Sequence, residues 1–152
     1  MNVYRLANAR RAVSLSGEGA RRAGSRWNNI GTPVLCAASS KALATLEVLV
    51  RTPLAFIPDN YRMLTLNVPD DSLQSLSFNT LPNGWNSLNP PGSAKQLIDE
   101  WISGNRLLVL KVPSAVVEGD FNFLINPQHA RMTKAHRIDN QPCAFNKRLF
   151  RP

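Results

Sequence analysis

The order of strand-like and helix-like segments constrains this sequence most. Two segments have the composition and spacing of helices, residues 41–50 and 93–103, and six shorter apolar runs are typical of strands. The strand-like runs are residues 2–6, 33–38, 62–68, 106–112, 116–117 and 121–125. Because helices do not alternate regularly with strands, the order predicts an α+β fold rather than a doubly wound α/β fold. The 152 residues fit a single domain, 1–152, with a small mixed or split β-sheet and flanking helices.

Long connections separate these segments. Residues 7–31 are expected to be irregular because glycines interrupt them, and residues 79–92 form a loop rich in Asn, Pro and Gly. The chain after residue 125 is a basic tail without a predicted element. Residues 106–112 would be apolar on both faces of a strand, so we expect this strand near the centre of the sheet.

The two helices have recognisable ends. Ser40 offers an N-cap for the first helix, and Ser93 and Gln96 have the spacing of a capping box at the start of the second. Gly104 is expected to stop the second helix. Its apolar residues share one face, which is most simply interpreted as a core stripe; they are Leu97, Ile98, Trp101 and Ile102.

Glu47 is the most informative single residue. It follows Leu43 by four positions, which places a carboxylate on the same helix face as apolar side chains. Such a carboxylate is costly unless it is paired or used. Two interpretations remain open: a functional carboxylate, or a residue at the edge of the stripe that reaches water or pairs with Lys111 or Arg51.

The glycine-punctuated segment GEGARRAGSRWNNIG, residues 17–31, is the second informative feature. Its glycines allow tight turns from which Arg26 and Trp27 would project. A guanidinium beside an aromatic ring suits a diphosphate joined to a flat base. The segment lacks the strand and helix of a Rossmann fingerprint and the Gly-Lys-Ser/Thr of a P-loop, and a surface turn with a buried Trp is the simpler alternative.

Other residues that could carry chemistry give weaker signals. Cys36 and Cys143 are too few and too far apart for a disulfide framework, and His129 and His136 lack a third ligand, so we expect no metal site. Ser114 stands at the end of a predicted strand, where its hydroxyl would cap a turn or bind a ligand.

The chain carries a net charge of +8 and has a pI of about 10.3. Basic residues crowd the first and last quarters. This charge fits nucleic-acid binding, an anionic small substrate, an acidic protein partner or a merely solubilising surface. A nucleic-acid-binding protein would be expected to have aromatic residues interleaved with the basic ones, or a helix-turn-helix pattern. Neither is visible in this sequence.

The sequence lacks the segments that would direct the protein to a membrane or out of the cell. The basic N-terminus lacks the apolar region of a secretion signal, and no run approaches the length of a membrane span. We therefore expect a cytoplasmic protein without membrane contact.

Taken together, the motifs resemble the RES-domain family, the toxins of bacterial toxin–antitoxin pairs. The matching segments cover nearly the whole chain in the family's order. They are YRL (4–6), GEGARRAGSRWNNIG (17–31), GTPVLCAASSKALATLEVL (31–49), PS (113–114), NFLINPQH (122–129) and FNKRLF (145–150). The family is named after its Arg, Glu and Ser, which here correspond to Arg26, Glu47 and Ser114.

The resemblance implies a fold similar to the catalytic core of ADP-ribosyltransferases. It also implies cleavage of the nicotinamide–ribose bond of NAD⁺ by hydrolysis or phosphorolysis, or transfer of ADP-ribose to a protein. NAD⁺ would be the substrate, and no bound cofactor is expected. In this scheme Glu47 stabilises the cationic transition state and Arg26 fixes the diphosphate. The further NAD-binding candidates that the resemblance implies are Arg5, Trp27, Ser39, Ser114 and Asn126.

The resemblance also implies a protein partner. The usual partner in the family is a small antitoxin with an Xre-like DNA-binding domain that covers the active site. DNA would then be contacted only indirectly, through the antitoxin. A homodimer or a hetero-oligomer with the antitoxin is expected.

One position departs from the family pattern. The family usually has tyrosine ten residues after the loop arginine, and this chain has Cys36 there. Cysteine is smaller and its thiol is a weak hydrogen-bonding group. An altered substrate choice, a weakened toxin, an engineered substitution or a domain that only binds its antitoxin would each fit this departure.

Overall fold

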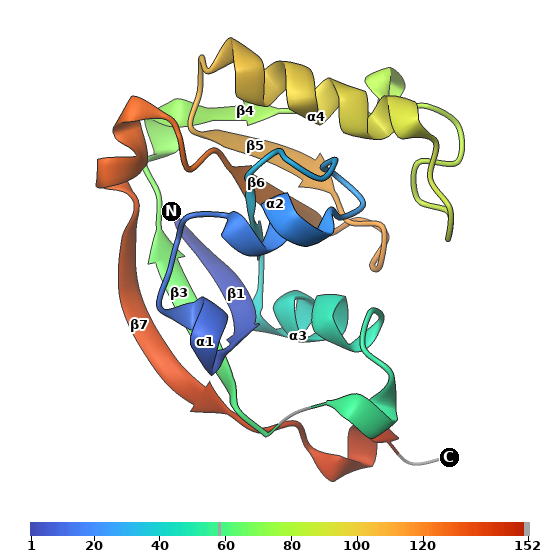
Figure 1. The fold of residues 1–152 in the computed structure, drawn as a ribbon, viewed down its shortest axis with the longest axis vertical. Helices are drawn as coiled ribbons and strands as arrows, with labels where there is room; N and C mark the ends of the chain where they lie inside the picture. Colours follow the sequence, from blue (N-terminus) through green and yellow to red (C-terminus); the bar gives the residue numbers. More distant parts are fainter. Residues whose placement is uncertain (58, 151–152) are drawn as a thin grey trace.

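The structure is a computed structural model that describes residues 1–57 and 59–150. Within these residues, seven strands form one mixed sheet flanked by four helices (Figure 1), which confirms the predicted α+β class. The strands are β1 (Asn2–Asn8), β2 (Leu35–Ala38), β3 (Tyr61–Asn67), β4 (Leu73–Ser75), β5 (Val109–Pro113), β6 (Phe121–Ile125) and β7 (His136–Cys143). The helices are α1 (Ala9–Ala12), α2 (Glu18–Ala23), α3 (Lys41–Leu49) and α4 (Gly92–Gly104). Single 3-10 turns occupy Leu54–Phe56, Asp70–Ser72, Phe78–Thr80, Ala130–Lys134 and Lys147–Phe150.

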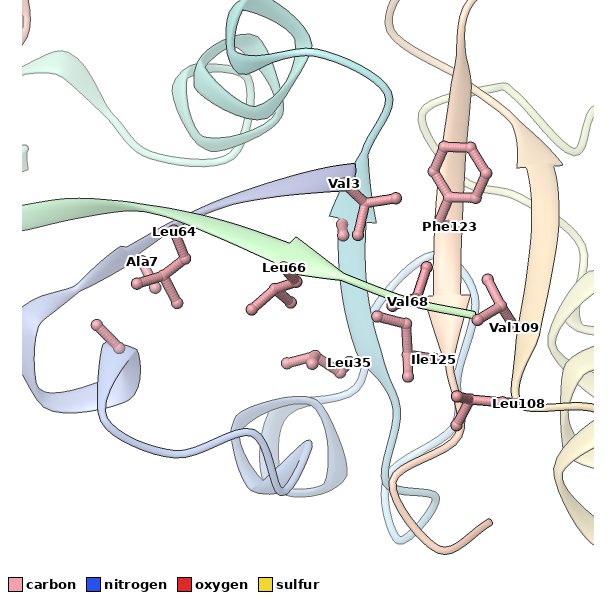
Figure 2. Close-up of a cluster of buried hydrophobic side chains, with 12 residues drawn as sticks. Val3, Ala7, Leu35, Leu64, Leu66, Val68, Leu108, Val109, Phe123 and Ile125 are labelled. Carbon is pink, nitrogen blue, oxygen red and sulfur yellow. The ribbon is translucent and has the colours of Figure 1, made fainter. Parts of the chain in front are cut away.

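The sheet consists of two parts that are joined by very little strand pairing. Its strand order is β4-β5-β6-β2-β1-β3-β7. Strand β1 pairs with β3 over its whole length, but it pairs with β2 only through Tyr4 and Ala38. Figure 2 shows β1 and β3 crossing β2 and β6 at a steep angle. We call β4, β5, β6 and β2 the first half-sheet and β1, β3 and β7 the second; beyond Tyr4, β1 and β2 diverge.

A cluster of apolar side chains fills the angle between the half-sheets. The second half-sheet contributes Val3, Leu64 and Leu66, and the first contributes Leu35 and Ile125 (Figure 2). All five are buried. We call this cluster the wedge. Because the wedge packs against both half-sheets at once, it fixes the angle at which they meet.

The long helices cover the sheet as their apolar faces require. Helix α4 packs Ile98 and Ile102 into a second cluster with residues of β5 and β6, while Leu97 and Trp101 are partly buried at its margin. The predicted core stripe is therefore confirmed. Helix α3 packs over β1 and β2 in a third cluster. No helix in the described part of the chain is long and apolar enough to cross a membrane.

The helix ends agree only partly with the sequence signals. The Ser40 hydroxyl accepts a hydrogen bond from the N–H of Leu43 at 3.0 Å, so the N-cap of α3 is confirmed. The capping box predicted at Ser93 is wrong, because α4 begins one residue earlier and its N-cap makes no side-chain hydrogen bond. Gly104 belongs to α4, and Asn105 with φ 49° ends the helix in its place.

Several elements were not predicted. Helices α1 and α2 lie within the segment expected to be irregular, and neither has an apolar stripe long enough to detect. Strand β7 lies in the predicted basic tail; it is an edge strand, and its sequence HRIDNQPC lacks apolar alternation because the strand is largely exposed. Strand β4 has only three residues.

Two strand predictions need correction. Residues 116–117 are not a strand but part of the turn between β5 and β6. This turn is closed by the N–H of Ser114, which donates to the carbonyl of Asp120 at 2.8 Å. Strand β5 lies between β4 and β6, so it is interior as expected, although only short β4 separates it from the edge.

We predict that Leu35→Ala destabilises the fold by about 2–5 kcal/mol, since it removes a side chain that is 1% exposed from the wedge between the half-sheets. Leu88→Ala is the matched control, because Leu88 is 92% exposed and its loss should change stability by no more than about 0.5 kcal/mol. Urea denaturation midpoints of the two variants would measure the difference. Equal midpoints would contradict the role of the wedge.

Candidate active site

A cleft of about 590 Å³ opens where β1 and β2 diverge. This volume lies in the range of small-molecule sites, roughly 300–1,000 Å³. The cleft is lined by β1, by α2 and the loop after it, by β2 and α3, and by the segment before and at the start of α4. The lining includes five of the residues singled out in the sequence: Arg5, Arg26, Trp27, Cys36 and Glu47. The split in the sheet thus brings together candidates from four separate elements.

The charge of the cleft is unbalanced. Among the described residues that line it, Glu47 is the only carboxylate. The cationic lining residues are Arg5, Arg11, Arg26, Arg51 and Lys95. A half-enclosed site with this excess of positive charge attracts anions more strongly than an open surface does.

Glu47 projects from α3 without a cationic partner in the part of the chain that is described. Its Oε1 accepts a hydrogen bond from the hydroxyl of Ser114 at 3.5 Å. Neither alternative pairing occurs. Arg51 donates from Nε to the backbone carbonyl of Glu47 at 2.8 Å, and the Lys111 ammonium lies 4.0 Å from the ring centroid of Phe121. The Glu47 carboxylate is therefore left available to a ligand.

Ser114 caps the turn after β5, one of the two roles considered for it, and also contacts Glu47. It is buried directly after β5, and its Oγ accepts hydrogen bonds from the N–H groups of Val116 at 3.0 Å and Val117 at 3.1 Å. These bonds fix the hydroxyl oxygen and leave its proton for Glu47. Ser114 lies behind the carboxylate rather than among the lining residues.

Asn28 holds the loop that carries Arg26. Its side chain is fully buried, and its Nδ2 lies within hydrogen-bond distance of the carbonyls of Ala20, Asn29 and Thr32. Its Oδ1 accepts from the hydroxyl of Ser25. One amide thus joins α2 to both sides of the loop, through three backbone carbonyls and the Ser25 hydroxyl.

The Arg26 side chain projects from this loop and contacts the segment that precedes α4. Its Nη1 donates to the carbonyl oxygens of Trp85 and Ser87, both at 2.8 Å. Trp27 is buried and stacks on Trp85, with ring centroids 5.6 Å apart. The guanidinium therefore fastens the segment before α4 to the loop after α2, while its remaining donors are directed to no group in the described chain.

The basic residues of α2 have a different function from those in the cleft. Arg21 and Arg22 both donate to the carboxylate of Glu18. These contacts, the hydrogen bond from Arg21 above all, lower the pKa of Glu18 to about 2. Part of the basic N-terminal quarter is therefore neutralised within its own helix.

Two glycines set the backbone around α2. Gly17 has φ 71°, and a Cβ there would lie 2.8 Å from the backbone nitrogen of Val34. Gly24 has φ 70° and ends the helix. A larger residue at position 17 would displace β2 and with it one wall of the cleft.

Arg5 spans the split in the sheet. Its Nη1 donates to the carbonyl of Cys36 at 2.9 Å, so it satisfies a backbone group that β1 leaves unpaired. Its Nε is buried and has no hydrogen-bond partner among residues 1–57 and 59–150. Burial lowers the pKa of Arg5 and raises the pKa of the Cys36 thiol. The thiol is therefore held in its protonated form near neutral pH.

Two candidates lie elsewhere. Ser39 is exposed and donates its N–H to the carbonyl of Phe121. Asn126 is buried at the far end of β6, where its Nδ2 donates to Asn105 and its Oδ1 accepts from the N–H of Gln128. Neither residue is part of the cleft lining; the asparagine of β6 that lines it is Asn122, at the other end of the strand.

Several charged or aromatic lining residues were not assigned to the site from the sequence. Arg51 was considered only as a possible partner of Glu47, although its spacing of one helical turn also indicates a shared face. Arg11 and Lys95 had no distinguishing pattern, and Tyr61 reaches the cleft only through the pairing of β3 with β1.

Comparisons with known proteins identify a matching family and two similar relatives. The family model described as RES domain matches residues 2–146. A protein named Toxin Res from Photorhabdus laumondii is 33% identical over 144 residues, covering 91% of this chain and 92% of that protein. A protein named Prs ADP-ribosylating toxin from a Sphingobium species is 38% identical over 133 residues, covering 84% and 82%.

A solved structure has the same fold. It is the M. tuberculosis MbcT–MbcA toxin–antitoxin complex, and the matching chain gives a TM-score of 0.74 at 24% identity. The match covers 98% of this chain and 86% of that chain.

We predict that Asn28→Ala destabilises the protein by about 1–3 kcal/mol, because it removes a fully buried amide that donates to the carbonyls of Ala20 and Thr32. Loosening of the loop should also change the position of Arg26. Thermal unfolding would measure the loss, with Asn89→Ala as the matched control because Asn89 is exposed. Unchanged stability in Asn28→Ala would show that the loop does not depend on this amide.

Proposed function

The chain belongs to the RES-domain family of toxins, and we propose on this premise that it cleaves the nicotinamide–ribose bond of NAD⁺. The observation that carries the proposal is a single carboxylate, Glu47, in a cleft whose other charged lining residues, among those described, are all cations. It would act as the toxin of a toxin–antitoxin pair. NAD⁺ is its substrate in this scheme and no bound cofactor takes part.

The presence of one carboxylate fits this particular bond. Ordinary glycoside hydrolysis uses two carboxyl groups, one of which protonates the leaving group. The nicotinamide of NAD⁺ carries a positive charge and leaves as a neutral molecule, so no acid is needed. What remains is to stabilise the oxocarbenium-like ribose, and the Glu47 carboxylate, oriented by Ser114, can do this.

The cations of the cleft suit the rest of the substrate. NAD⁺ carries a diphosphate, and guanidinium groups bind phosphate oxygens in a bidentate manner. Binding energy gained there orients the distant scissile bond. Arg26 is placed for this role by its loop, with Arg5 and Arg51 on other walls of the cleft.

Transfer of ADP-ribose to a protein is the second candidate. It is supported by the relative named Prs ADP-ribosylating toxin, which is 38% identical to this chain. The chemistry at the ribose would be the same, and only the acceptor would differ: water, phosphate or a protein side chain. Product masses measured with and without phosphate separate the three.

We also propose an antitoxin partner, of the Xre-like DNA-binding type. Its support is the similar chain seen in a toxin–antitoxin complex. Large apolar side chains stand exposed at the cleft, Val50 and Leu88 among its lining residues and Ile30 in a shallow hollow beside it. A partner seated on them would close the cleft, and DNA would be reached through that partner. Homodimer formation stays a prediction.

We predict that Glu47→Gln lowers the rate of nicotinamide release from NAD⁺ about a hundredfold or more, because the amide cannot neutralise a cationic transition state. Nicotinamide is quantified by chromatography after incubation with the purified protein. Glu118→Gln is the matched control, since Glu118 is exposed and outside the cleft. Equal turnover of both variants would rule out Glu47 as the catalytic carboxylate.

A second prediction concerns Cys36, which stands where the family usually has tyrosine. Cys36→Tyr should raise the rate of NAD⁺ consumption about tenfold, the effect of one added contact worth about 1.4 kcal/mol in the transition state. Cys143→Tyr, outside the cleft lining, is the control. No change in Cys36→Tyr, together with no NAD⁺ loss in the original protein, would favour a domain that acts only by binding.

A further inference from the structure

Tyr61 is an aromatic residue of the cleft that the proposed reaction does not use. It is the first residue of β3 and lies opposite Asn8 of β1. Its ring packs edge-on against Phe145, with centroids 5.3 Å apart, and Phe145 packs against Phe150 at 6.1 Å. These contacts hold the Tyr61 ring in place, yet the residue is only half-buried and lines the cleft.

The other aromatic rings of the lining are differently placed. Trp27 is buried and stacked on Trp85. Tyr4 lies at the junction of the half-sheets, with the Lys41 ammonium 5.9 Å from its ring centroid. Tyr61 is therefore the ring that stands away from the junction.

The Glu47 carboxylate lies close to this junction. It contacts Ser114, which directly follows β5. The last residue of β5 pairs with Phe121, and the next residue of β6 pairs with Ala38. Ala38 is the residue of β2 that pairs with Tyr4. These successive strand pairings place the Glu47 carboxylate at the end of the cleft where the half-sheets meet.

Tyr61 lies at the opposite end of the cleft. Strand β1 runs from Tyr4 at the junction to Asn8, and four residues of extended chain span about 13 Å. Because Tyr61 lies directly opposite Asn8, its backbone is separated from the junction by about this length of strand. The distance is comparable with that between the two bases of a dinucleotide and leaves room for a diphosphate.

Besides Arg26, three arginines line the cleft. Arg5 follows the junction residue in β1, Arg11 lies in α1 just beyond the end of β1, and Arg51 lies one helical turn after Glu47. The pKa of Arg5 is lowered mainly by burial and further by the charges of Arg51 and Arg11, in line with their common place in the lining. Such a cluster repels itself until an anion binds.

We propose that the cleft binds NAD⁺ in one direction, with the nicotinamide-side ribose at Glu47, the diphosphate on the arginines of the lining, Arg26 included, and adenine against Tyr61. The inference rests on the proposed function and adds to it the orientation of the substrate and the residue that recognises adenine. Stacking of a base on an aromatic ring tolerates rotation of the base, so a single fixed ring at the end of the cleft is sufficient.

Tyr61→Leu tests the proposal, with Tyr61→Phe as the matched control that keeps the ring. Both are made in the Glu47→Gln background so that ligands are not consumed, and binding is measured by calorimetry. Tyr61→Leu should weaken ADP-ribose and NAD⁺ about tenfold, the loss of one base stack. It should leave nicotinamide mononucleotide, which lacks adenine, unchanged, and Tyr61→Phe should bind all three ligands normally.

The outcomes distinguish the orientation from the proposed function. Weaker binding of nicotinamide mononucleotide with unchanged ADP-ribose would reverse the direction and overturn the inference. Loss of all three ligands in Tyr61→Leu but not in Tyr61→Phe would assign the ring to the shared nicotinamide-side region, which also overturns it. Unchanged NAD⁺ affinity in Tyr61→Leu would contradict the orientation alone. Failure of the protein with native Tyr61 to bind NAD⁺ would contradict the proposed function itself.

Discussion

The single pairing of Tyr4 with Ala38 is the contact on which the rest of this structure depends. It joins two half-sheets that otherwise diverge, and the apolar wedge around Leu35 fixes the angle between them. A continuous sheet would satisfy the backbone of β1 and β2 by strand pairing and leave no space. Here Arg5 satisfies the carbonyl of Cys36 instead, and the space between the strands becomes a cleft.

The electrostatics of the protein follow from this division. Five cations and one carboxylate line the cleft, an arrangement that costs stability in the empty protein and is relieved by a dianionic diphosphate. Outside the cleft, Glu18 binds Arg21 and Arg22 and offsets part of their positive charge. On the proposed function, the excess of positive charge in the cleft serves to bind the diphosphate of NAD⁺.

The sequence predicted those parts of the fold that have a strong period. Helix α3 with its Ser40 cap, the stripe of α4 and the interior strand β5 all follow from apolar spacing. Helix α2 and strand β7 were missed because ion pairs and edge pairing stabilise them rather than burial of an apolar face. An edge strand leaves no apolar period in the sequence, and ion pairs at i,i+3 and i,i+4 are too weak a signal to predict a six-residue helix.

The site was predicted to a similar extent. The ordered motifs correctly grouped Arg26 and Glu47 into one cleft, although each was ambiguous alone. The motifs indicated Asn126, whose side chain bonds Asn105 away from the cleft, and they did not indicate Asn122, which lines the cleft. Tyr61 could not be found, because its position depends on the register of β3 against β1, which only the folded sheet determines.

The most direct measurement is a crystal structure of the Glu47→Gln protein with NAD⁺. Our account predicts that the dinucleotide occupies the space between β1 and β2, with the anomeric carbon of the nicotinamide-side ribose in contact with the side chain at position 47. A dinucleotide bound elsewhere on the molecule, or one whose ribose lies away from position 47, would contradict it.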